Sequence, residues 1–106
     1  MLIHDLDTPA VVCDLDKLER NLQETAASCR AAGIPLRSHT KSHKIPEIAH
    51  MQLRSGAIGI CCQKVGEAEV MVAAGVTDIL LPALRVACVP LIEPLRQPSV
   101  TAYTFQ

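Results

Sequence analysis

The chain has 106 residues, of which 49% are hydrophobic and 20% are charged, and its net charge is -1. This length fits one domain or part of one, and the composition excludes a disordered chain. One Tyr, one Phe, no Trp and the near-neutral charge argue against a nucleic-acid-binding protein. No apolar run approaches the ~20 residues needed to span a bilayer, and the first residues lack a signal-peptide pattern. We therefore expect a cytoplasmic protein.

Strands and helices are expected to alternate along the first 82 residues. Strand character marks four short apolar segments, at residues 9–15, 34–39, 57–62 and 78–81. Helices are expected to start near Asp16, Pro46 and Lys64 and to end at Gly33, Gly56 and Gly75. Asp16, followed three residues later by Glu19, predicts a capping box at the first helix. Glu67 and Glu69 are expected on the surface of the third helix.

The alternation predicts an α/β fold built from βα units. The glycines that end the helices are about twenty residues apart, which is the length of one such unit. Repeated units imply a parallel sheet or barrel, in which the chemistry lies at the carboxyl ends of the strands. Lys41 and Gln63 fall at those ends.

A cluster of cations follows the second expected strand, within the sequence RSHTKSHK at residues 37–44. If that strand continues to residue 43, its alternation places Arg37, His39, Lys41 and His43 on one face. A lysine at a strand end among cations suits Schiff-base chemistry, because like charges favour the neutral amine. The alternative is a basic surface loop without a function.

The five cysteines do not suggest a disulfide framework or a zinc ribbon, because their number is odd and no Cys-x-x-Cys occurs. Cys13, Cys29 and Cys61 lie in apolar patterns and are expected in the core, reduced. His39 and His43 could ligate a metal, but two histidines without a third ligand favour supporting or exposed roles instead.

Several short motifs, in this order and spacing, resemble one enzyme family along residues 6–82. They are LDTPA (6–10), DLD (14–16), RSHTKSHK (37–44), PEIA (46–49), GICCQK (59–64), EA (67–68) and AAGVTDIL (73–80). Together they are similar to the N-terminal part of the D-threonine aldolase and D-serine dehydratase group. That group belongs to the alanine-racemase-like, fold-type III pyridoxal-phosphate enzymes.

The resemblance implies a (β/α)8 TIM barrel, of which this chain would supply about three βα units. It implies that Lys41 holds pyridoxal 5'-phosphate as a Schiff base, with His39 and Gln63 as cofactor neighbours. Lys44 is expected to reach solvent or to pair with Glu47. Relatives would carry a divalent metal whose ligands lie in a C-terminal domain that is absent here, so no metal ligand is assigned.

Residues 1–82 are expected to form the N-terminal part of a pyridoxal-phosphate-binding barrel. Residues 83–106, with prolines every four residues from Pro90 to Pro98, are expected to be an irregular tail. We expect a truncated or frame-shifted lyase for small D-β-hydroxy amino acids, incomplete for catalysis. A genuine short protein would need a partner to cover its sheet edge, whereas full-length relatives are expected to form homo-oligomers. The alternatives are a cofactor-binding protein without turnover, a racemase of the same fold, or an interaction module without a ligand.

Overall fold

The computed structural model of the chain describes residues 2–82 and 100–102. Its elements in chain order are η1 (Ile3–Asp5), α1 (Leu15–Ala31), β1 (Arg37–His39), α2 (Pro46–Ser55), β2 (Gly59–Cys61), α3 (Val65–Ala73), β3 (Ile79–Leu81) and β4 (Val100–Ala102). The expected alternation of strands and helices is therefore confirmed from β1 to β3.

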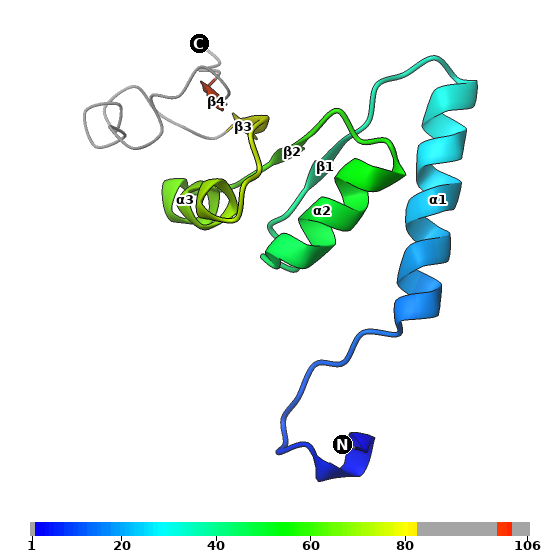
Figure 1. Cartoon of the computed structure of the whole chain (residues 1–106), viewed down its shortest axis with the longest axis vertical. Coiled ribbons are helices and arrows are strands. Elements are labelled where there is room, and N and C mark those ends of the chain that lie inside the picture. Colours follow the sequence, from blue (N-terminus) through cyan, green and yellow to red (C-terminus); the bar gives the residue numbers. More distant parts are fainter. Residues whose placement is uncertain (1, 83–99, 103–106) are drawn as a thin grey trace.

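The strands form one parallel sheet in the order β1-β2-β3-β4. α2 packs against β2 and α3 against β3, while α1 lies against α2 (Figure 1). Apolar side chains from the strands and from the inner faces of α2 and α3 fill the space between them. This core consists of Ala49, Ile60, Cys62, Ala68, Met71, Val76, Ile79 and Leu81.

The helix ends follow the sequence signals. Pro46 occupies the first turn of α2, where its missing N–H costs nothing. Gly56 ends the same helix with a φ of 116°, a left-handed conformation that glycine adopts without a steric penalty. His50 then joins α2 to the end of α3, because its Nε2 lies 2.9 Å from the carbonyl oxygen of Ala74.

The start of α1 differs from the prediction. Asp14, not Asp16, caps this helix, because its Oδ1 accepts a 3.1 Å hydrogen bond from the main-chain N–H of Lys17. Asp16 lies inside the first turn. The expected strand at residues 9–15 is absent, since residues 10–14 are irregular and pair with none of the strands in the described part of the chain.

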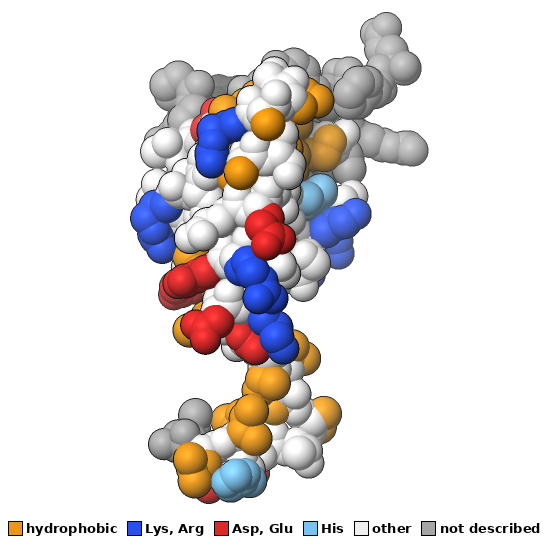
Figure 2. Space-filling model, turned by 90° about the vertical axis from the view of Figure 1, so that its right-hand side faces the viewer, with side chains coloured by type: hydrophobic (Ala, Val, Ile, Leu, Met, Phe, Trp, Pro, Cys, Tyr) orange, Lys and Arg blue, Asp and Glu red, His pale blue; other side chains and the backbone are white. Residues whose placement is uncertain are grey.

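The segment before α1 extends away from the sheet and ends in η1, far from the other elements (Figure 1). Its apolar side chains Leu2, Ile3, Val11 and Val12 are exposed, and Figure 2 shows such side chains along the narrow lower part of the molecule. Cys13 lies in this segment, so its expected burial is wrong. Cys29 and Cys61 are half-buried and Cys62 is buried, whereas Cys88 lies outside the described residues.

Acidic and basic side chains are mixed over the face that carries α1 (Figure 2). Across residues 2–82 and 100–102, no helix combines the length and apolar character that crossing a membrane requires.

Of the tail expected to be irregular, the structure describes only residues 100–102, and these form β4 beside β3. The rest of that tail lies outside the described residues.

Candidate functional site

Two loops leave the same edge of the sheet and contain the residues singled out in the sequence. We define the Lys41 loop as residues 40–45, after β1, and the Gln63 loop as residues 62–64, after β2. His39 and Cys61, the last residues of these strands, are paired in the parallel register. Both loops therefore begin at the carboxyl edge of the sheet, as expected for a site in an α/β fold.

Lys41 lies on a turn rather than on a strand. β1 ends at His39, and the main-chain N–H groups of His43 and Lys44 both donate to the carbonyl of Thr40, at 3.2 and 2.7 Å. The strand alternation expected for residues 37, 39, 41 and 43 therefore stops at His39, because the hydrogen bonds to the carbonyl of Thr40 form a turn that reverses the chain. Lys41 is exposed.

His39 contacts the main chain of Lys41. Its Nδ1 accepts a hydrogen bond from the N–H of Lys41, with a donor–acceptor distance of 3.2 Å. In a neutral imidazole whose Nδ1 accepts, the proton resides on Nε2. The structure thus brings His39 and Lys41 together, with the second ring nitrogen of His39 left as a donor.

Thr40 fixes the Lys41 loop to the second strand. It is fully buried, its N–H donates to the carbonyl of Cys61 at 2.9 Å, and its hydroxyl donates to the same oxygen at 3.0 Å. The hydroxyl also lies 3.4 Å from the sulfur of Cys62. Burial raises the pKa of both the Cys61 and the Cys62 thiols, so neither cysteine is activated as a nucleophile.

Glu67 links the two loops and was not recognised as a site residue in the sequence. Its Oε2 accepts a 2.9 Å hydrogen bond from the N–H of Gln63, and its Oε1 lies 3.3 Å from Nζ of Lys44. Lys44 therefore pairs with Glu67 and not with Glu47. The expectation that Glu67 belongs to the helix surface is wrong, because only 10% of its side chain is exposed. Its position three residues after Lys64, which precedes α3, is the available sequence signal.

The side chain of His43 makes a hydrogen bond within the Lys41 loop. Its Nδ1 accepts a hydrogen bond from the N–H of Ile45 at 3.0 Å. Burial lowers the pKa of His43. His43 is therefore neutral at pH 7.

The described residues hold no group of three or more His, Cys, Asp or Glu side chains that could bind a metal.

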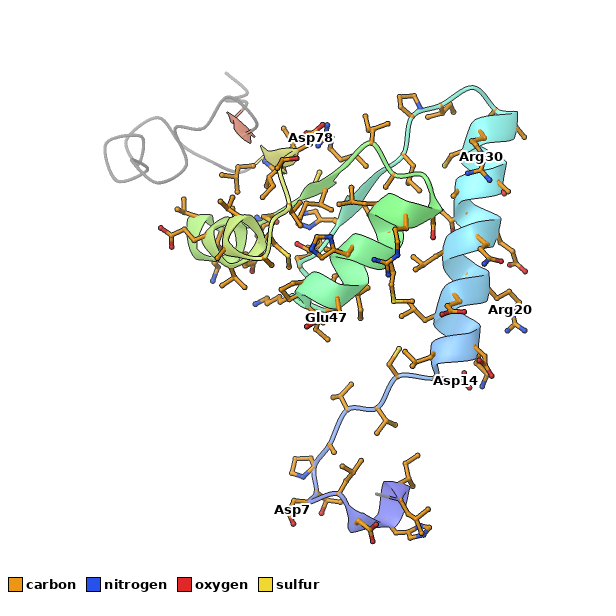
Figure 3. All side chains as sticks on the ribbon, viewed as in Figure 1. Asp7, Asp14, Arg20, Arg30, Glu47 and Asp78 are labelled. Carbon is orange, nitrogen blue, oxygen red and sulfur yellow. The ribbon has the colours of Figure 1, made fainter. Side chains whose placement is uncertain are left out.

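Arg37 lies at the opposite end of β1 and does not join the loops. Its Nη1 lies 2.7 Å from Oδ1 of Asp78, the residue before β3, and the Arg37 side chain passes over Gly59 of β2 to reach it. Asp78 is labelled beside β3 in Figure 3. A surface pocket of about 530 Å³ lies between α1 and α2, with Leu22 and Met51 in its lining. None of Lys41, His39 and Gln63 lines that pocket.

Two curated proteins match most of this chain. The D-threonine aldolase of an Arthrobacter species is 53% identical over 74 residues, which are 70% of this chain and 20% of the aldolase. The 3-hydroxy-D-aspartate aldolase of Paracoccus denitrificans is 40% identical over 78 residues, which are 73% of this chain and 20% of that enzyme. The chain is a homologue of these aldolases. It spans about a fifth of the length of the relatives it matches. No protein-family model matches the chain.

Solved structures give the same result for the fold. The crystal structure of D-threonine aldolase from Filomicrobium marinum is 56% identical with a TM-score of 0.72, and the match covers 74% of this chain and 21% of that one. D-threo-3-hydroxyaspartate dehydratase from Delftia sp. HT23 is 40% identical with a TM-score of 0.79, over 86% of this chain and 24% of its own. The predicted fold class, part of an alanine-racemase-like barrel, is confirmed.

Proposed function

We propose that this chain carries the cofactor-binding lysine of a pyridoxal-phosphate-dependent lyase for small D-β-hydroxy amino acids, and that Lys41 is this lysine. The observation that carries the proposal is the position of Lys41, exposed two residues after the end of β1 in a chain that is 53% identical to a D-threonine aldolase over 74 residues. His39 and Gln63 are proposed as neighbours of the cofactor.

The residues present fit an aldehyde cofactor. A primary amine must be accessible and uncommitted to form a covalent bond with an aldehyde. Nζ of Lys41 makes no ion pair within residues 2–82, whereas Lys17 pairs with Asp14 and Lys44 pairs with Glu67. Lys41 is therefore the lysine of its loop whose amine is available.

Lys41 and His39 have separate tasks in the proposed site. Lys41 would bind the cofactor through its amine and, once a substrate amine displaced it, could accept or donate a proton at Cα. His39 holds the main chain of Lys41 through Nδ1 and presents its Nε2–H as a donor. The cofactor, when bound, supplies an electron-withdrawing pyridinium ring that weakens the bonds to Cα.

The names of the relatives support the proposed substrate class. They are named as enzymes of D-threonine and of 3-hydroxy-D-aspartate, which are both small D-amino acids with a hydroxyl on Cβ. One relative is named as a dehydratase, so cleavage between Cα and Cβ and loss of the hydroxyl are both candidate reactions. We infer that the chain alone turns over weakly or not at all, because β1 pairs only with β2 in the described sheet and leaves one edge open.

The proposal is tested by locating the cofactor on the chain. The full chain is incubated with pyridoxal phosphate, its absorption near the visible edge is recorded, and the product is reduced with borohydride and mapped by peptide mass spectrometry. The expected result is an absorption band and a label on Lys41. Lys41→Arg keeps the charge but cannot form the bond, so it should lose both signals. Lys64→Arg, which changes an exposed lysine near the same sheet edge, should keep both.

Two outcomes would change the proposal. Labelling spread over Lys17, Lys41 and Lys64 alike would mean that no site selects Lys41, and the proposal would be wrong. A specific label on Lys41 together with rapid consumption of D-threonine or D-serine would instead overturn the inference that the chain alone turns over weakly or not at all.

A further inference from the structure

We propose that Glu67 is a positioning residue with two effects: it fixes the position of Lys41, and it prevents Lys44 from competing with Lys41 for the cofactor. This rests on the proposed role of Lys41. One carboxylate oxygen holds the Gln63 loop through the N–H of Gln63, and the other holds the Lys41 loop through Nζ of Lys44. A single side chain thus bridges the two loops that carry the candidate site.

The contact with Lys44 acts on the backbone that supports Lys41. Lys44 has a φ of 55°, which non-glycine residues seldom adopt, and its N–H closes the turn on Thr40 at 2.7 Å. A backbone conformation of this kind persists only where neighbouring contacts hold it in place. The ion pair between Lys44 and Glu67 provides such a contact through the Lys44 side chain. Lys41 is the first residue inside this turn, so its position depends on the same conformation.

Glu67 is suited to this task because it stays charged. The hydrogen bond from Gln63, together with the contacts with Lys44, outweighs the opposing effect of burial and holds the pKa of Glu67 below its ordinary value of 4.5. Only 10% of the Glu67 side chain is exposed, so its ion pair is less screened than a fully exposed one.

The same ion pair separates the two lysines of the loop. Nζ of Lys44 lies 3.3 Å from Oε1 of Glu67, and this ion pair must break before the amine can approach an aldehyde. Nζ of Lys41 has no carboxylate partner within residues 2–82. Glu67 therefore makes Lys44 a poor competitor for the cofactor although it lies only three residues away.

The experiment measures where the label goes. Glu67→Gln keeps an acceptor for the N–H of Gln63 but removes the charge that faces Lys44. After borohydride reduction with pyridoxal phosphate, we expect the ratio of label on Lys41 to label on Lys44 to fall about two- to fivefold, the range for a partly exposed ion pair. Glu69→Gln removes an equal charge from the exposed side of the same helix and should leave the ratio unchanged. An unchanged ratio in Glu67→Gln would refute the proposal.

A second measurement does not need the cofactor. Amide hydrogen exchange in Glu67→Gln should be about two- to fivefold faster at Lys44 and nearly unchanged at Gln63. In Glu67→Ala both amides should exchange faster. If the Lys44 amide keeps its exchange rate in both variants, Glu67 does not position the loop. If no label reaches Lys41 in the unsubstituted chain, the proposed function fails, and the exchange rates alone decide the role of Glu67.

Discussion

The hydroxyl of Thr40 donates a 3.0 Å hydrogen bond to the main-chain carbonyl of Cys61, between the ends of two neighbouring strands. Thr40 is the only polar residue among the described ones that is completely buried. Because Lys41 follows directly, this bond fixes the point at which the candidate cofactor lysine leaves the sheet.

Thr40→Val should destabilise the chain by about 1–2 kcal/mol, because it removes a buried hydroxyl hydrogen bond while nearly keeping the side-chain volume. Thermal or urea unfolding followed by circular dichroism measures this, since the chain has no Trp. Thr77→Val, at an exposed position, is the matched control and should change stability little. Equal stabilities of the two variants would show that the Thr40 hydroxyl contributes nothing.

Gly59→Ala should destabilise the chain by about 1–3 kcal/mol through overpacking. A Cβ at position 59 would lie 2.8 Å from the carbonyl oxygen of Asp78 and would collide with the guanidinium of Arg37. The ion pair between Arg37 and Asp78 crosses the strand at this point and leaves room only for hydrogen. Gly66→Ala in α3 meets no atom within 4 Å and should keep or slightly raise the unfolding midpoint. Two equally stable variants would contradict the close approach at Gly59.

Asp14→Ala should cost about 1 kcal/mol, because it removes the cap of α1. Asp14, labelled at the foot of α1 in Figure 3, also pairs with Lys17 at 3.2 Å, but both side chains are exposed and the pair adds little. Asp16→Ala removes only a favourable charge near the helix N-terminus, worth about 0.3 kcal/mol. Unfolding midpoints of the two variants compare them directly. A larger loss of stability in Asp16→Ala than in Asp14→Ala would show that Asp16 caps the helix, as the sequence predicted.

The stability of the chain should fall as the pH falls below about 6.5, and His43 should contribute to this fall. Its pKa is lowered by burial, so the unfolded chain binds a proton at a higher pH than the folded chain does. The contribution is therefore complete above the ordinary pKa and is lost between that value and the lowered one. Unfolding midpoints between pH 5 and 8 should show a smaller slope for His43→Asn, whereas His4→Asn, at an exposed position, should retain the slope of the unsubstituted chain. Equal slopes in all three proteins would exclude His43 as a source.

The sequence predicted the arrangement of helices and strands well where the signals are local. Gly56 and Pro46 define the ends of α2 through backbone preferences that hold in any context. The alternation of βα units gave the parallel sheet, and the motifs around Lys41 gave the relationship to the aldolases. Asp14 and Asp16 were harder to distinguish, since both are good caps and two residues separate them.

Only the tertiary structure decided which residues meet at the carboxyl edge. Glu67 lies 23 residues after Lys44 in the chain, and no local signal says that its carboxylate reaches back to that lysine. The parallel register of His39 with Cys61 brings the two loops together, and the turn closed by Thr40 sets where Lys41 stands. The sequence by itself determined the relationship to the aldolases and singled out Lys41 as the candidate lysine, because both depend on residue type and order. The surroundings of that lysine depend on contacts between distant segments, which form only when the strands pair.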